Sequence, residues 1–281
     1  MKKLILPGVF NFISNKTIVT YDEDGNPIKK LTIETNVIAQ SHRLSSYPPL
    51  TKNIYKGSCS ESDAFIETWK NSHQIEIHNL LTKQTDSNTQ TLPKPCLSFE
   101  DFNFPDRLLH ILSRGGFIEP TAIQACSLPL ALSGRNLIGS SATGSGKTLC
   151  YLLPLILHII HQTNFHSHQQ GPLGLILVPT RELADQIASV GKAFFAVYKI
   201  QTVCITGGMS EWQQKKTLYN QTPDVIIGTP GRFIELVNKN YCCLDNCSFV
   251  VCVYHWIDCR FWMKQIVWCP WDSSSRFALC C

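Results

Sequence analysis

The sequence predicts an α/β fold in which a parallel sheet is covered by helices on both faces. From Leu97 onward, short apolar runs alternate with longer segments of helical pattern. The apolar runs lack polar alternation, which is typical of strands that are buried on both faces. A glycine-rich turn joins the first of these runs to the next helix, as in α/β proteins that bind ligands at strand ends. With 281 residues, 44% of them hydrophobic, the chain has enough apolar material for a substantial core.

Expected strands and helices alternate throughout this region. The strands are expected at Asn136–Gly139, Leu173–Val178, Thr202–Thr206, Asp224–Gly228 and Ser248–Val251. The helices between them are expected at Thr148–Gln162, Arg181–Tyr198, Ser210–Tyr219 and Gly231–Asn238. Because parallel strands are joined by crossover helices, this alternation favours a parallel sheet.

Composition divides the chain into three segments. Residues 1–92 have no sustained period and contain polar and turn-forming clusters, so they are expected to be a largely irregular extension. Residues 93–251 are the expected α/β domain. Residues 252–281 carry four of the six tryptophans and five of the thirteen cysteines without a helical or strand period, and are expected to be an aberrant tail. An alternative exon, a retained intron or a frameshift would each produce this change in composition. A sheet that ended at residue 251 would leave one of its edges uncovered.

Charge and cysteine usage narrow the class of protein only slightly. The formal charge of +4 is compatible with an anionic partner without establishing one. The cysteines lack the paired C-x-x-C spacing of a zinc or thioredoxin-like site, and the irregular spacing of Cys247, Cys252 and Cys259 around His255 disfavours zinc. The apolar stretch Leu149–Ile160 is shorter than the about 20 residues of a membrane span. We expect an intracellular protein. The sequence does not distinguish the nucleus from the cytoplasm.

A glycine-rich turn from Ser140 to Thr148 follows the first expected strand and leads straight into a helix. Its glycines let backbone N–H groups point at phosphate oxygens, and the helix dipole adds to the attraction. Lys147 is expected at the β- and γ-phosphates of a nucleotide, and the Thr148 hydroxyl is expected to ligate Mg²⁺, which makes these two the candidate catalytic residues. Ser141 stands where glycine or alanine is usual, and its small side chain should fit. The candidate phosphate-binding residues are Ala142, Thr143, Gly144, Ser145, Gly146, Lys147 and Thr148.

A segment upstream of this turn narrows the class of nucleotide-binding protein. Gly116–Gln124 resembles the Q motif of DEAD-box RNA helicases, in the branch that reads Glu-Pro-Thr-Ala-Ile-Gln. The resemblance implies a RecA-like P-loop domain that binds ATP, with the Gln124 amide against the adenine edge. It also implies that Phe99, seventeen positions before Gly116, packs on the base. The other candidate nucleotide-binding residues of this segment are Phe117 and Thr121.

Three strand-end segments resemble, in order, the RNA-contacting motifs of the first lobe of these helicases. Their residues are Pro179, Thr180, Arg181, Gly207, Gly208, Thr229, Pro230, Gly231 and Arg232. They offer N–H groups, hydroxyls and guanidinium groups at the sheet edge where α/β proteins bind ligands, so we expect sequence-independent contacts to RNA phosphates and 2′-hydroxyls. The alternative is that Arg181 and Arg232 are solvated residues at helix starts. The segment Tyr47–Tyr55 resembles the extension of the same branch, so residues from Lys52 onward are expected to dock on the lobe.

The resemblance covers residues 93–251 and then breaks. After Phe249–Val251 the family pattern has Asp-Glu-Ala-Asp, whose carboxylates hold Mg²⁺ and polarise the attacking water. The sequence instead continues Cys252–Trp256, without a carboxylate in register, and no second lobe follows. The resemblance implies an ATP-dependent RNA helicase, while this chain is expected to be a fragment without useful ATP turnover. Still open are a non-catalytic nucleotide- or RNA-binding fragment, a mis-predicted gene product, and a P-loop enzyme of another class, such as a small-molecule kinase, which would have no use for the Q motif.

Overall fold

The computed structural model describes residues 54–55, 59, 61–77, 92–162, 171–244 and 246–253 in full, and only the backbone of residues 18–21, 27–31 and 276–280. The elements along the chain are β1 (Ile18–Tyr21), β2 (Pro27–Leu31), α1 (Asp63–Ser72), the 3-10 helix η3 (Glu100–Phe102), α2 (Asp106–Arg114), α3 (Ala122–Leu132), β3 (Leu137–Gly139), α4 (Lys147–His161), β4 (Gly174–Leu177), α5 (Arg181–Val197), β5 (Thr202–Ile205), α6 (Glu211–Asn220), β6 (Val225–Gly228), α7 (Pro230–Asn238), β7 (Phe249–Val253) and β8 (Arg276–Cys280). Among the described helices, none is long and apolar enough to span a membrane.

Six strands form one sheet in the order β3-β8-β7-β4-β6-β5, and every neighbouring pair is parallel. Gly174 at the start of β4 is level with Val225 of β6 and with Phe249 of β7. β1 and β2 pair in a separate antiparallel hairpin. The predicted α/β fold with a parallel sheet is confirmed, and each expected strand and helix is present with bounds that differ by at most two residues.

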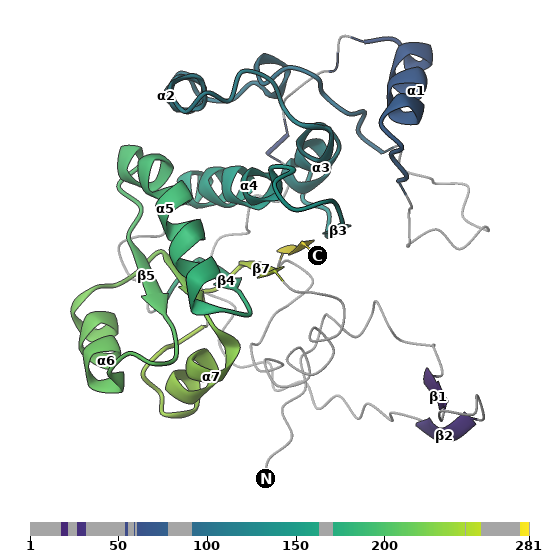
Figure 1. The fold of residues 1–281 in the computed structure, drawn as a ribbon. Coiled ribbons are helices and arrows are strands. Elements are labelled where there is room, and N and C mark those ends of the chain that lie inside the picture. Colours follow the sequence, from purple (N-terminus) through teal and green to yellow (C-terminus); the bar gives the residue numbers. More distant parts are fainter. Residues whose placement is uncertain are drawn as a thin grey trace, which may run out of the picture.

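Helices cover both faces of the sheet because successive side chains of a strand point to opposite sides. Ile176 of β4 belongs to the larger core cluster, which includes side chains of α2, α4 and α5. Leu175 and Leu177 belong to the smaller cluster, which α7 closes with Phe233 and Leu236. Figure 1 shows α4 and α5 on one side of β4 and α7 on the other. The expected covering of both faces is therefore confirmed.

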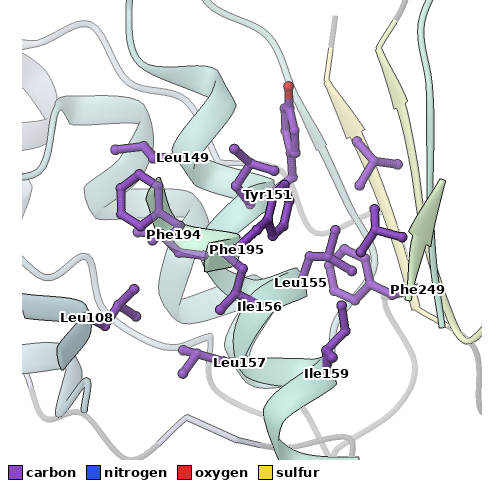
Figure 2. Close-up of a cluster of buried hydrophobic side chains, with 14 of the residues drawn as sticks. Leu108, Leu149, Tyr151, Leu155, Ile156, Leu157, Ile159, Phe194, Phe195 and Phe249 are labelled. Carbon is purple, nitrogen blue, oxygen red and sulfur yellow. The ribbon is translucent and has the colours of Figure 1, made fainter. Parts of the chain in front are cut away.

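Helix α4 lies at the centre of the larger cluster. Its residues are buried almost without interruption from Leu149 to Ile159, so the helix is held from several sides. Figure 2 shows Leu155 and Ile156 of α4 among Phe194 of α5 and Phe249 of β7. Because α4 begins at Lys147, this packing fixes the position of the lysine at its first turn.

Strand β8 lies within the tail. Residues 252–281 show no strand period and are expected to be an aberrant tail, yet β8 lies between β7 and β3 and pairs in parallel with both. Parallel sheets are usually covered on both faces, and strands in such sheets lack polar alternation, so a strand period is not required for it to form. The sheet does not end at residue 251. In the described part of the chain, β8 is the strand that joins β3 to the rest of the sheet.

Helices α1, α2 and α3 precede the first helix that the sequence analysis expects. α3 is apolar and mostly buried, which hides its helical period, whereas α2 is amphipathic and has Leu108 and Leu112 on its buried face. The expected docking of the extension is seen at two residues. The backbone N–H groups of Ile54 and Tyr55 donate to the Leu132 carbonyl at the end of α3, at 2.8 and 3.0 Å.

Candidate functional site

The glycine-rich turn connects β3 to α4 and has two glycines in the left-handed region. Gly144 has a φ of +79°, and Gly146, the N-cap of α4, has a φ of +90°. Only glycine adopts this backbone without strain, which explains the glycines at these two positions. Ala142, Thr143 and Gly144 are exposed at the tip of the turn. The turn thus presents backbone to solvent at the N-terminus of a helix, the arrangement that binds phosphate.

Lys147 folds its ammonium group over the turn. Its Nζ donates to the carbonyl oxygens of Ser141 and of Ala142, the second at 3.0 Å. The Ser141 hydroxyl lies 2.6 Å from the Ser145 hydroxyl, so the unusual serine fits and braces the turn from within. Thr148 is half-buried in the first turn of α4. The residues predicted to hold phosphate and metal therefore gather around one turn.

The Q-motif segment is hydrogen-bonded to this turn. Thr121 caps α3 in a capping box, in which the Gln124 Oε1 accepts from the Thr121 N–H at 3.0 Å. The other side of the amide faces the turn, because Gln124 Nε2 donates to the Gly146 carbonyl at 2.9 Å. The Thr121 hydroxyl donates to the Ser145 carbonyl at 2.8 Å. Two segments more than twenty residues apart are thus joined by two side chains. The buried Gln124 takes part both in the capping box and in the contact with the turn.

Of the two aromatic candidates of this region, Phe99 lies in the core and Phe117 is half-buried against it. Phe99 is 3% exposed and its ring is 6.3 Å from that of Phe102. Phe117 packs at a tilt against Phe194 of α5, with ring centroids 6.5 Å apart. The structure brings Thr121 and Gln124 to the phosphate-binding turn, whereas Phe99 and Phe117 make contacts of the hydrophobic core. Packing of Phe99 on a base stays a prediction.

The three segments predicted to contact RNA follow β4, β5 and β6 and meet at one edge of the sheet. Thr180 caps α5 by accepting from the Leu183 N–H at 3.3 Å. A Cβ added to Gly208 would lie 3.8 Å from the Arg181 guanidinium, so these two segments are neighbours. The Gly207 N–H donates to the Thr229 hydroxyl at 3.3 Å. Arg181 is 52% exposed, and its ion pair with Asp185 is long, at 3.9 Å, so its guanidinium is accessible in the described part of the chain.

Arg232 has a different environment. It is 15% exposed and donates from Nη1 to the Met209 carbonyl at 3.0 Å and to Gln214 Oε1 at 3.4 Å. Its Nε lies 3.0 Å from Glu235 Oε2. The alternative interpretation, a solvated helix-start residue, fits Arg181 better than Arg232. Arg232 ties the start of α7 to the segment that follows β5.

Sequence reasoning missed Gln214, the buried polar residue of α6. Its Nε2 donates to the Thr206 carbonyl at 2.8 Å while its Oε1 accepts from Arg232. Nearby, Lys239 bonds Glu211 and Glu235 at 2.6 and 3.0 Å, and these contacts lower the pKa of Glu235 and raise that of Lys239. The only sequence signal for Gln214 was a glutamine on the side of α6 opposite its lysines.

The end of β7 has no carboxylate within the described residues. Cys252 is 7% exposed and is level with Leu177 of β4, and the strand ends at Val253. The residues from Tyr254 to Ser275 lie outside the described part of the chain. Among the residues that are described, no group of three histidine, cysteine or acidic side chains is placed to hold a metal ion.

Comparison with known proteins decides the family. A family model described as DEAD/DEAH box helicase matches residues 121–252, from the capping threonine of the Q motif to the cysteine of β7. ATP-dependent RNA helicase DDX42 of Pongo abelii is 36% identical over 243 residues, which is 82% of this chain and 24% of that protein. The chain belongs to the DEAD-box RNA helicase family.

Other members of the DEAD-box family agree in sequence and in fold. DEAD-box ATP-dependent RNA helicase 20 of Arabidopsis thaliana is 37% identical over 211 residues, 74% of this chain and 40% of that protein. The crystal structure of the RNA-helicase Prp28 from Chaetomium thermophilum bound to ADP superposes with a TM-score of 0.66 at 30% identity, covering 80% of this chain and 52% of that one. This chain therefore spans between a quarter and two fifths of these curated relatives, and its domain has the RecA-like fold of the first lobe.

Proposed function

We propose that this domain is the ATP-binding and RNA-contacting lobe of an ATP-dependent RNA helicase. The observation that carries the proposal is the pair of hydrogen bonds from Thr121 and Gln124 to the backbone of the phosphate-binding turn. After these contacts the Gln124 amide retains one N–H and one oxygen lone pair. Adenine offers the complementary N7 acceptor and N6 donor. One residue would thus link recognition of the base to the position of the phosphates.

The phosphates would replace the backbone carbonyls as partners of Lys147. The ammonium group is already at the turn, and the exposed residues 142–144 can approach a ligand with their backbone. Thr148 would ligate Mg²⁺, which when bound neutralises charge on the β- and γ-phosphates. An open turn with positive-φ glycines fits the phosphate groups of a nucleotide.

RNA would lie across the three strand-end segments. Thr180 and Arg181 are exposed beside Gly208, and together they offer a hydroxyl, a guanidinium group and backbone N–H groups. Groups of this kind bind phosphates and 2′-hydroxyls and do not distinguish bases. Arg232 would contribute to RNA binding by positioning the segment after β5, more than by contacting the RNA directly.

We further propose that this chain binds ATP without hydrolysing it at a useful rate. Cys252 and Val253 stand at the end of β7, where the family pattern has carboxylates. A thiol and an isopropyl group cannot hold hydrated Mg²⁺ or polarise an attacking water as carboxylates do. The chain would then be a nucleotide- and RNA-binding member of a catalytic family.

Binding of a fluorescent ATP analogue to the full chain tests the proposal. Lys147→Ala should reduce the affinity at least about tenfold, because it removes the only lysine of the turn. Gln124→Ala should abolish the preference for ATP over GTP, whereas the exposed Gln213→Ala should leave it unchanged. No affinity for ATP in the unmodified chain would refute nucleotide binding. RNA-stimulated phosphate release well above that of Lys147→Ala would refute the inactive state.

A further inference from the structure

The outward side of α6 carries an unusual set of exposed side chains. Trp212 is 66% exposed and Tyr219 is 88% exposed, and Lys215 and Lys216 lie between them. Positions 212, 215, 216 and 219 share one side of a helix, since residues three, four and seven apart are neighbours. The opposite side holds the buried Gln214. We call Trp212, Lys215, Lys216 and Tyr219 the α6 outer face.

The α6 outer face is cationic and aromatic. Lys216 Nζ lies 5.2 Å from the centre of the Trp212 ring, and Lys215 Nζ lies 4.2 Å from that of Tyr241. The carboxylates of α6 and α7, Glu211 and Glu235, are engaged by Lys239. In the part of the chain described, neither lysine of the face forms an ion pair. Two large exposed aromatic rings together with two such lysines resemble the stacking surfaces that bind single-stranded nucleic acid.

The α6 outer face is rigidly connected to the strand-end segments. From its inner side, α6 reaches the Thr206 carbonyl through Gln214, and Arg232 holds both Gln214 and the Met209 carbonyl. Met209, itself 40% exposed, follows Gly207 and Gly208 directly and leads into the N-cap Ser210. A strand of RNA that leaves Gly208 would therefore meet Trp212 within the first turn of the helix.

We propose that the α6 outer face is a stacking platform for unpaired bases of single-stranded RNA that continues from the strand-end segments. The proposal rests on the RNA contact proposed above and extends it. Bases of any sequence stack on tryptophan and tyrosine, and the lysines neutralise the adjoining phosphates. A protein partner is the less suitable occupant, because interface cores are depleted of lysine, and here lysines separate the aromatic rings.

The length dependence of RNA binding tests the platform. Labelled oligouridylates of about six and about twelve nucleotides are titrated against the full chain, since such sites accept roughly 4–16 nucleotides. The longer RNA should bind at least about fivefold more tightly, and Trp212→Ala with Tyr219→Ala should remove that gain without weakening the short RNA. Lys215→Gln with Lys216→Gln should reduce the salt dependence of the longer complex. Phe65→Ala, at a 48% exposed position on α1, is the matched control.

The outcomes separate the platform from the proposed function. Thr180→Ala with Arg181→Ala should weaken both RNAs, and if the unmodified chain binds neither RNA, the RNA function itself is refuted. If the tryptophan and tyrosine variant keeps the full gain with length, the platform is refuted while the RNA function stands. Self-association that Trp212→Ala abolishes, with unchanged RNA binding, would assign the α6 outer face to a second copy of the chain and also refute the platform.

An independent inference concerns the codons beyond β7. Trp262 and Met263 each have a single codon in the standard code, UGG and AUG. In the frame that starts at the last base of the Trp262 codon, the first two triplets are GAU and GAA. They encode Asp-Glu, whichever of the two lysine codons is used for Lys264. The next two triplets are GCA and GAU when Lys264 is encoded by AAG and Gln265 by CAG. These triplets encode Ala-Asp.

We infer that the codons from Trp262 to Ile266 encode the Asp-Glu-Ala-Asp motif in a shifted frame, and that the chain leaves the helicase frame between Val251 and Trp262. The family match ends at residue 252, in β7. Val253 is level with Cys280 of β8, and Cys280 is level with Gly139, where the phosphate-binding turn begins. Carboxylates placed directly after β7 would therefore stand at the same edge of the sheet as the turn.

Nucleotide sequencing of the gene and its transcripts across these codons is the test. We expect AAG for Lys264, CAG for Gln265, and a transcript in which the frame is restored between the codons for Val251 and Trp262. AAA at Lys264 would give threonine and CAA at Gln265 would give asparagine, and either codon would overturn the inference. A single transcript without the frame-restoring join would overturn it as well.

Discussion

At the scale of the residue, the contact between Gln124 and Gly146 would connect the proposed recognition of a base to the conformation of the phosphate-binding turn. Each motif is visible in the sequence, but their hydrogen bond is not. The glycine is needed twice, because its φ is +90° and because a Cβ there would lie 2.5 Å from Gln124 Nε2. For Phe99 the sequence and the structure point to different contacts. The resemblance implies that it packs on a base, whereas the structure places it in the core, where it is 3% exposed.

Gly146→Ala is expected to reduce both stability and nucleotide affinity. The strained φ and the displaced Gln124 should together cost about 1–3 kcal/mol of unfolding free energy. Gly144→Ala is the matched control, because its φ is also positive but nothing lies within 4 Å of the added Cβ. Urea unfolding and titration with an ATP analogue measure the two effects. Equal losses in both variants would show that the contact with Gln124 does not matter.

Buried thiols predict a loss of stability at alkaline pH. Burial raises the pKa of the Cys96, Cys126 and Cys150 thiols to about 11, from an ordinary value of 9.0. Between pH 9.0 and about 11 the thiols of the unfolded chain lose protons that the thiols of the folded chain keep. The free energy of unfolding therefore falls as the pH rises. Thermal unfolding from pH 8 to about 11 should show the decline. Cys150→Ala should make it shallower, and an unchanged slope would contradict the assignment.

At the scale of the element, the helices and strands from β3 to β7 could be predicted from their pattern, and their functional arrangement could not. α4 and α5 were expected within one residue of their bounds because long apolar or amphipathic runs determine them locally. The link between α6 and α7 depends on Gln214 and Arg232, which are eighteen positions apart. No local period encodes such a pair, so its role is visible only after the chain has folded.

Arg232→Lys should separate structural from RNA-binding roles. Lysine cannot reproduce the contacts of the guanidinium group to Met209, Gln214 and Glu235, so we expect a loss of about 1–2 kcal/mol of unfolding free energy. The exposed Arg181→Lys should change stability by less than about 0.5 kcal/mol while weakening RNA binding. Denaturant unfolding of the two variants gives the comparison. Equal stabilities would mean that the Arg232 contacts do not hold the two helices together.

At the scale of the whole molecule, the sheet depends on a strand from the end of the chain. β8 separates β3 from β7, so the phosphate-binding turn is joined to the strand-end segments through β8. Because all six strands are parallel, their carboxyl ends lie at one edge of the sheet, where the nucleotide and RNA sites are proposed. The chain thus uses its last described segment to complete a domain whose other strands end at residue 253.

A chain that ends at Val253 should therefore be less stable and bind ATP more weakly. Without β8, β3 loses its partner in the described sheet and the turn that follows it loses its support. We expect the melting temperature to fall by at least roughly 5 °C. A chain that ends at Cys280 is the control, because it keeps the whole strand. Equal melting temperatures for the two chains would show that β8 does not contribute to the folded domain.

The sequence by itself determined the alternation of strands and helices, the phosphate-binding turn and the family motifs, because each depends on residues that are close together in the chain. Only the tertiary structure decided that β8 enters the sheet, that Gln124 reaches Gly146, that Arg232 bonds Met209 and Gln214, and that α6 turns two aromatic rings outward. These features depend on contacts between distant segments. Their free energy arises from burial and hydrogen bonds that form only when those segments meet.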